Sequence, residues 1–265
     1  MVTTTNATQG WYLYGITRSG PRVDEPLQLL EFSGLAAVVT PVSLADFSSA
    51  ALRERMQDAS VLESTVRDHN RVVETIHAAQ AILPAKFGLV YTNADDVVAS
   101  LQRAHDTLLD QLNRLDRCDE WAVHLYANRA AQRERISTGD PAIQLLREQR
   151  AAARPGRAYF IEQQLRVEVD VATAQALWNL AQSAFGQLSA HAVSGQLNPI
   201  KAGTAADDAG EVEIMRASFL VARDGAERFK AEARSIADTS AGTRCEYSGP
   251  WPPYSFAERA DEEAA

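Results

Sequence analysis

The hydrophobic period of the chain changes several times between residues 11 and 127, and this order constrains the fold more than any other feature. Short aromatic or apolar stretches predict β-strands at 11–16, 27–42, 85–92 and 120–127. Apolar residues at three- and four-residue steps predict helices within 44–81 and 94–116. This alternation suits an antiparallel sheet with helices packed on one face, which is an α+β sandwich.

Local signals mark several element boundaries. The run Leu35–Val39 is continuously apolar, as in a strand buried on both faces. Asn93 is placed to cap the second helix, and Asp140 followed by Pro141 is a helix start signal. Pro84 ends the first helical region, because proline cannot donate the next helical hydrogen bond.

The second half of the chain repeats the mixed order with more helix. A polar, charged stretch after residue 127 indicates a domain boundary. The patterns beyond it predict helices between 142 and 183, strands at 188–194 and 212–223, a helix at 225–237 and a final strand before the proline cluster. We therefore expect two α+β domains, 1–127 and 128–256, with a disordered arm at 1–10 and a disordered acidic tail at 257–265.

Charge and composition exclude several classes of partner. The net charge of −9 disfavours nucleic acid and anionic membranes, because phosphate contacts need a basic face. No apolar run approaches the roughly 18 residues of a membrane helix, and the N-terminus lacks the pattern of a signal peptide. Cys118 and Cys245 are then expected to be reduced thiols in a cytoplasm.

No catalytic or metal-binding pattern stands out. The chain has no nucleophile elbow, no dinucleotide fingerprint and no P-loop, and its histidines and cysteines lack the spacing of a metal site. The many acids and arginines of 53–74 alternate as on a solvated helix face. We expect no enzyme activity, no catalytic residue, no metal and no cofactor.

Two short stretches are candidates for contacts. The close "SGPWPPYSF" offers Trp251, Tyr254 and Phe256 either as a latch folded between the domains or as a docking surface for a partner. "LPAKFG" is either an anion-binding turn or the end of a strand, with Phe87 buried and Lys86 as the exposed group.

Five stretches together resemble the F/L family of gas vesicle proteins (GvpF/GvpL). In chain order they are "WYLYGI", "LPAKFGLVY", "EWAVHLY", "GRAYF" and "SGPWPPYSF". The resemblance spans about residues 11–256, and "GPWPPYSF" is its most specific piece. The sequence departs from the family pattern at Lys86, where the family usually has arginine, and at Leu89, where it usually has threonine.

The resemblance implies a role and a fold. Gas vesicles are gas-filled shells built in the cytoplasm from a small, very hydrophobic shell protein. The F/L proteins are accessory or minor structural components that contact the shell protein and assist assembly, and their domains have ferredoxin-like character. The expected partners are therefore the shell protein and other gas vesicle accessory proteins, bound without enzymatic chemistry.

Two other functions stay open at this point. Ferredoxin-like sandwiches often bind metabolites, so a small-ligand-binding regulatory protein is the alternative. An enzyme would require a cluster of perturbed titratable groups in a cleft, which a sequence alone does not reveal.

Overall fold

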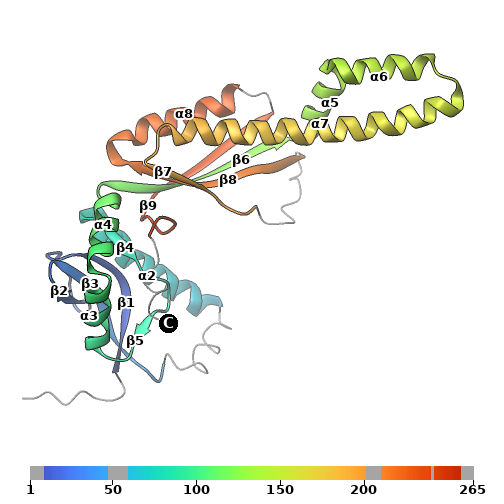
Figure 1. The fold of residues 1–265 in the computed structure, drawn as a ribbon. Helices are drawn as coiled ribbons and strands as arrows, with labels where there is room; N and C mark the ends of the chain where they lie inside the picture. Colours follow the sequence, from blue (N-terminus) through green and yellow to red (C-terminus); the bar gives the residue numbers. More distant parts are fainter. Residues whose placement is uncertain (1–8, 47–58, 201–209, 240–241, 258–265) are drawn as a thin grey trace, which may run out of the picture. The chain divides into compact units, whose positions relative to one another are not determined.

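The chain is described by a computed structural model that covers residues 9–46, 59–200, 210–239 and 242–257. It forms two compact units, one of residues 1–120 with 250–265 and one of residues 121–249. Each unit combines one β-sheet with α-helices, so the predicted α+β fold class is confirmed (Figure 1).

The first sheet has the strand order β2-β3-β1-β4, and β5 also pairs with β1. All of its pairings are antiparallel. Its strands are β1 (Gln9–Arg18), β2 (Gln28–Phe32), β3 (Leu35–Ser43), β4 (Ile82–Pro84) and β5 (Val90–Tyr91). Residues 9 and 10, predicted as the end of a disordered arm, belong to β1. Residues 1–8 of that arm lie outside the described residues.

Helices cover both faces of the first sheet, whereas the sequence pattern predicts one covered face. Val38 of β3 packs in one apolar cluster with Val73 of α2 (Ala59–Ala79). Val39 faces the other side and pairs with Leu13, which lines a pocket together with Leu108 of α4 (His105–Leu115). The reason is visible in the run Leu35–Val39, whose residues are all 0% exposed, as expected for a strand buried on both faces.

The predicted helix 94–116 is divided in two. α3 (Ala94–Arg103) begins at the predicted cap, where the Asn93 side chain accepts a hydrogen bond from the Asp96 amide. Ala104 then leaves helical geometry, and α4 begins at the next residue. The first part of the predicted helix 44–81 falls on 47–58, which lie outside the described residues.

Gly15 permits a close approach of backbone inside the first sheet. A Cβ atom at this position would lie 2.7 Å from the carbonyl oxygen of Leu83 and 2.8 Å from Cδ1 of Ile82. We expect Gly15→Ala to lower the free energy of unfolding by about 1–3 kcal/mol, because the backbone of β4 must shift. Urea denaturation measures this loss.

Gly186 provides the matched control for Gly15. It lies in α7 (Pro155–Ser189), and a Cβ there would meet no atom within 4 Å. Gly186→Ala should raise stability by about 0.5–1 kcal/mol through helix propensity. Equal effects of the two substitutions would contradict the assigned role of Gly15.

The second sheet has the strand order β7-β8-β6-β9. The elements follow one another as strand, helices, two strands, helix and strand, which is the order of the ferredoxin-like split β-α-β motif. They are β6 (Cys118–Asn128), α5 (Arg129–Gly139), α6 (Pro141–Ala152), α7, β7 (Ser194–Leu197), β8 (Glu211–Ala222), the short 3₁₀ helix η1 (Arg223–Gly225), α8 (Ala226–Thr239) and β9 (Thr243–Trp251).

The core of the second unit lies between its sheet and two helices. α7 contributes Ala184 and Leu188, α8 contributes Phe229, and Phe219 of β8 packs against Phe229 with ring centroids 5.3 Å apart. Because Leu188 belongs to this core as part of α7, the prediction of a strand at 188–194 is wrong. The charged stretch after residue 127 forms α5, and Asp140 caps α6 as predicted.

The closing segment belongs to the first unit. The sequence pattern predicts that residues 250–256 close the second domain, but their contacts group them with residues 1–120. Pro252, Pro253 and Phe256 are buried, and Trp251 and Tyr254 are partly exposed.

Candidate partner-binding site

The edge of the first sheet is interrupted beside β1. β4 pairs with Gly15–Thr17 and β5 pairs with Trp11 and Tyr12, so residues 85–89 leave the sheet between them. The predicted continuous strand 85–92 is therefore wrong. Gly88 has φ +86°, a left-handed conformation that glycine adopts without strain. Hydrogen bonds from the Ala85 amide to the Tyr14 carbonyl and from the Leu13 amide to the Leu89 carbonyl, both 2.9 Å, hold the ends of this loop.

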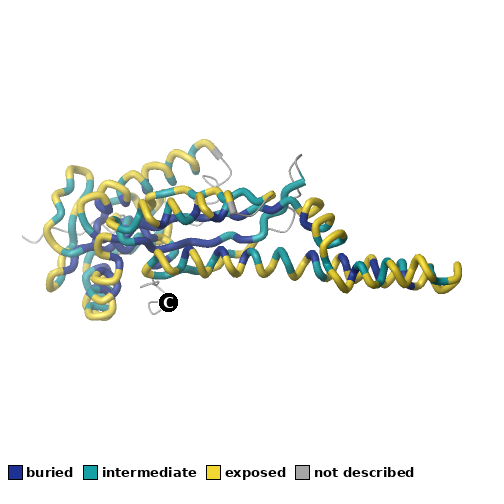
Figure 2. Tube along the Cα trace, turned by 90° about the horizontal axis from the view of Figure 1, so that it is seen from above, coloured by how far each residue is buried: buried dark blue, intermediate teal, exposed yellow. Residues whose placement is uncertain are grey.

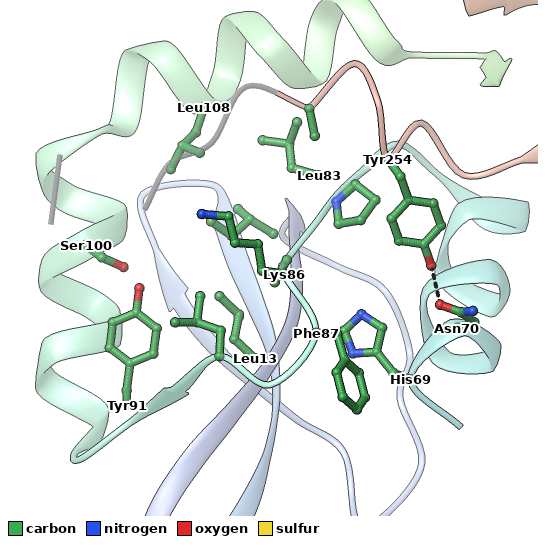
Figure 3. Close-up of a pocket in the computed structure, with 15 residues that line it drawn as sticks. Leu13, His69, Asn70, Leu83, Lys86, Phe87, Tyr91, Ser100, Leu108 and Tyr254 are labelled. Atoms are coloured by element: carbon green, nitrogen blue, oxygen red, sulfur yellow. Dashed lines mark hydrogen bonds between the residues drawn. The ribbon is translucent and has the colours of Figure 1, made fainter. Parts of the chain in front are cut away.

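A pocket of about 280 Å³ opens at this interruption. Figure 3 shows the Lys86 side chain crossing it, with Leu108 on one side and His69 and Tyr254 on the other. Nine of the fifteen lining residues are apolar. The lining consists of Leu13, Ile16, His69, Asn70, Leu83, Pro84, Ala85, Lys86, Phe87, Leu89, Tyr91, Ser100, Leu108, Tyr254 and Ala257.

Hydrogen bonds fix the closing segment at the pocket. The Tyr254 hydroxyl donates to Oδ1 of Asn70 at 3.0 Å (Figure 3). The amide and hydroxyl of Ser255 donate to the two carboxylate oxygens of Glu120 at 2.7 and 2.5 Å. Arg114 donates to the carbonyl of Phe256 at 2.7 Å. This wall of the pocket is thus anchored by three residues distant in sequence.

An aromatic cluster lies behind the loop. The Tyr12 hydroxyl and Nδ1 of His69 are 2.8 Å apart, and the Gly88 amide donates to the same hydroxyl at 3.3 Å. Tyr14 stacks on His69, and Phe87 contacts it edge-on with centroids 5.8 Å apart. Burial raises the pKa of Tyr12 to about 12, so the phenol is neutral.

The buried position of His69 makes the first unit sensitive to acid. Burial lowers the pKa of His69, and the carbonyl of Ala85 opposes part of that shift. The unfolded chain therefore binds a proton on His69 more readily than the folded chain does. The contribution of neutral His69 to the stability of the fold is complete above pH about 6.5 and is lost as the pH falls below that value. We expect stability to fall between pH about 7 and about 5, by at most about 1.4 kcal/mol per pH unit from this residue.

Urea denaturation at several pH values measures this effect. His69→Gln cannot take up the proton and should show a shallower loss of stability toward low pH than the wild type. Parallel pH profiles for the two proteins would contradict the role assigned to His69.

The structure brings together three of the five residues singled out from the sequence. Lys86, Phe87 and Tyr254 line the same pocket, and Phe87 is 43% exposed rather than buried. Phe256 is buried next to this wall, and Trp251, 44% exposed, does not line the pocket. The role of Trp251 as a latch between domains stays a prediction.

Sequence reasoning missed His69, Asn70 and Tyr91 as members of the site. His69 and Asn70 belong to α2, where the helical period marks them only as helix positions. Tyr91 belongs to the stretch predicted as a strand. The glycine of "LPAKFG" was the one local signal of a break at this edge.

The arrangement suits recognition of an apolar group. The pocket lies near the lower end of the volumes of small-molecule sites, which are about 300–1,000 Å³. Lys86 supplies a cation, and Tyr91 and Ser100 supply hydroxyls at one side of the apolar lining. Among the described residues no cluster of three or more His, Cys, Asp or Glu side chains could hold a metal ion. No helix in the described ranges has the length and apolarity needed to cross a bilayer.

Comparison with known sequences gives matches over nearly the whole chain. A family model described as "Gas vesicle synthesis protein GvpL/GvpF" matches residues 10–258. "Gas vesicle protein L" of Streptomyces sp. (strain CB03234) is 28% identical over 264 residues, which cover 95% of this chain and 94% of that protein. "Gas vesicle protein F" of the same strain is 27% identical, with 93% and 99% covered.

Two crystal structures share the fold. GvpF from Anabaena sp. PCC7120 has a TM-score of 0.70 at 20% identity, with 95% of this chain and 99% of that chain covered. GvpF from Microcystis aeruginosa has a TM-score of 0.62 at 17% identity, with 94% and 99% covered. The two-sheet α+β architecture therefore extends over the full length of these neighbours.

Proposed function

This chain belongs to the gas vesicle synthesis protein GvpL/GvpF family, and on that premise we propose that it is a non-enzymatic accessory protein that binds the hydrophobic shell protein of gas vesicles and assists its assembly. Membership of the family gives the chain a gas-vesicle-related role. We propose in addition that the partner is the shell protein and that it binds at the pocket described above. The chain would act in the cytoplasm and at the surface of the growing vesicle. Other gas vesicle accessory proteins are the further partners.

One observation carries the choice of site: Lys86, Phe87 and Tyr254 converge on one mostly apolar pocket. These residues come from two sequence stretches of the family resemblance, which are far apart along the chain. A hydrophobic protein with open strand edges aggregates unless its apolar surface is covered. An apolar side chain of the shell protein seated in this pocket would leave water, with the exposed ring of Phe87 packed against it.

The chemistry of the lining supports binding rather than catalysis. Most lining residues are apolar, and the titratable pair behind the loop, Tyr12 and His69, is held in neutral form by burial. Tyr12 and His69 are neutral and hydrogen-bonded to each other behind the loop 85–89. We therefore expect them to hold the loop in place rather than to transfer a proton to a bound molecule.

The two-domain organisation is part of the proposal. The first unit, which carries the pocket, would bind the shell protein, and the second unit would be available to other partners. The closing segment packs in the first unit, so a fragment that ends at residue 127 would lack Tyr254 and Phe256. Binding experiments therefore need the full chain.

The experiment is a test of binding and of aggregation with purified components. The full-length chain should retain the shell protein on an affinity resin and should delay the rise in light scattering when the shell protein is diluted from detergent. If the full-length chain neither retains the shell protein nor delays its aggregation, the proposed function is refuted.

A small-ligand-binding regulatory protein is the second candidate, and the pocket volume together with Lys86 favours it. A metabolite that binds the folded chain would raise its melting temperature in proportion to the logarithm of ligand concentration over Kd. A reproducible rise that Phe87→Ser removes would support this candidate. Shell-protein binding in the absence of any such metabolite would favour the first.

A further inference from the structure

The closing segment brings the chain to the rim of the pocket in the first unit. The Ala257 amide donates to the Pro253 carbonyl at 3.1 Å, and Arg114 donates to the Phe256 carbonyl at 2.7 Å. Ala257 itself lines the pocket. Because consecutive Cα atoms are about 3.8 Å apart, Glu258 starts beside the pocket lining.

The residues that follow Ala257 are mostly acidic. Residues 258–265, the remainder of the predicted acidic tail, lie outside the described residues, and we call them the tail. They include one arginine, Arg259, and four acids, which gives a net charge of 1 − 4 = −3. The four acids are Glu258, Asp261, Glu262 and Glu263.

The length of the tail keeps its acids close to the pocket. One residue extends a chain by at most about 3.3–3.6 Å, so an acid six residues beyond Ala257 stays within about 20 Å of it. Groups tethered over so short a span have an effective concentration of the order of millimolar. Even a weak contact between the tail and the pocket is then populated.

The charges around the pocket favour one side of it for a carboxylate. Lys86 is the one lysine in the sequence of the first unit, and Figure 3 shows its ammonium on the side of Leu108, away from Tyr254. On the other side, burial and then the negative charges of Glu74 and Glu120 raise the pKa of Tyr254. A carboxylate at the pocket is therefore attracted toward Lys86 and repelled from Tyr254.

We propose that the tail docks across the mouth of the pocket, with its carboxylates on Lys86, and competes with the shell protein for this site. The inference rests on the proposed function and adds an autoinhibitory contact to it. Most of the lining is apolar, so carboxylates leave it unfilled and an apolar side chain of the shell protein packs there better. Because exposed ion pairs are individually weak, the shell protein can displace the tail.

Acetylation of Lys86 tests the docking without the shell protein. The full-length chain is treated with an N-hydroxysuccinimide ester, and the rate at each lysine is read by mass spectrometry. In the neutral-tail variant, the loss of four carboxylates should raise the rate at Lys86 at least threefold, because the tail no longer covers the amine. Lys230 of the second unit is the internal reference, and its rate should not change. The substitutions in the neutral-tail variant are Glu258→Gln, Asp261→Asn, Glu262→Gln and Glu263→Gln.

A control variant removes four acids from the second unit and so changes the net charge equally. Its substitutions are Glu148→Gln, Glu168→Gln, Asp207→Asn and Asp208→Asn. Glu148 and Glu168 are exposed on α6 and α7, two helices whose surface is largely exposed in Figure 2. The control should acetylate Lys86 at the wild-type rate. A wild-type rate in the neutral-tail variant, or an equal rise in both variants, would overturn the proposal.

Affinity for the shell protein tests the competition. The neutral-tail variant should bind about 3- to 10-fold more tightly than the wild type at 0.15 M salt. The difference should vanish at 1 M salt, where the Debye length is about 3 Å. Equal affinities at 0.15 M salt would refute the competition. If none of the proteins binds the shell protein, the proposed function and the competition both fail, whereas the acetylation rates still decide whether the tail docks.

Discussion

Phe256→Ala is expected to lower the free energy of unfolding of the first unit by about 3–5 kcal/mol. The Phe256 side chain is 5% exposed, so its removal leaves a cavity among residues far from it in sequence. The backbone on either side is held by Arg114 and Glu120, which restricts collapse of the cavity. Urea denaturation, monitored by the hydrogen exchange of residues 9–46, measures this loss of stability.

Trp251→Ala is the matched control for this prediction. Trp251 belongs to the same closing segment but is 44% exposed, so less apolar area leaves water when it packs. We expect its replacement to cost clearly less than the replacement of Phe256. Equal losses for the two variants, or an unchanged first unit in Phe256→Ala, would contradict the anchoring of this segment.

Phe229→Ala should destabilise the second unit by a similar amount, about 3–5 kcal/mol. Phe229 is 0% exposed and packs against Phe219 and against Trp121, whose ring centroid lies 6.3 Å away. Whole-domain stabilities are about 5–15 kcal/mol, so this single change would remove much of the second unit's stability. Hydrogen exchange should rise in β6, β8 and α8.

The distribution of this loss tests the two-domain organisation. Residues 9–46, which belong to the first unit, should keep their protection from exchange in Phe229→Ala. A simultaneous loss of protection in both units would show one cooperative body and would contradict two independent domains.

Local patterns in the sequence predict most of the elements, because their causes are local. The apolar run Leu35–Val39 indicates a strand buried on both faces, and each of these residues is fully buried. Asn93 and Asp140 cap helices where a short polar side chain can accept from the first-turn amides. The α+β class follows from the alternation of such elements.

Long-range contacts explain what sequence reasoning missed. The stretch 85–92 is strand-like apart from Gly88, and its pairing with β1 shows that residues 85–89 leave the sheet. The sequence around Leu188 is compatible with a strand or a helix. In the structure Leu188 is part of α7 and packs in the core with residues of β8 and α8. Tyr254 and Asn70 are 184 residues apart, so no local period could have joined them in one site.

The affinity of the full-length chain for the shell protein, measured for a matched pair of variants, tests the central claim most directly. Phe87→Ser removes an exposed aromatic ring from the pocket, and Leu145→Ser removes a similarly exposed apolar side chain from α6. We predict at least tenfold weaker binding for Phe87→Ser, about 1.4 kcal/mol, and unchanged binding for Leu145→Ser. Wild-type affinity in a folded Phe87→Ser variant would contradict the assignment of the pocket as the shell-protein site.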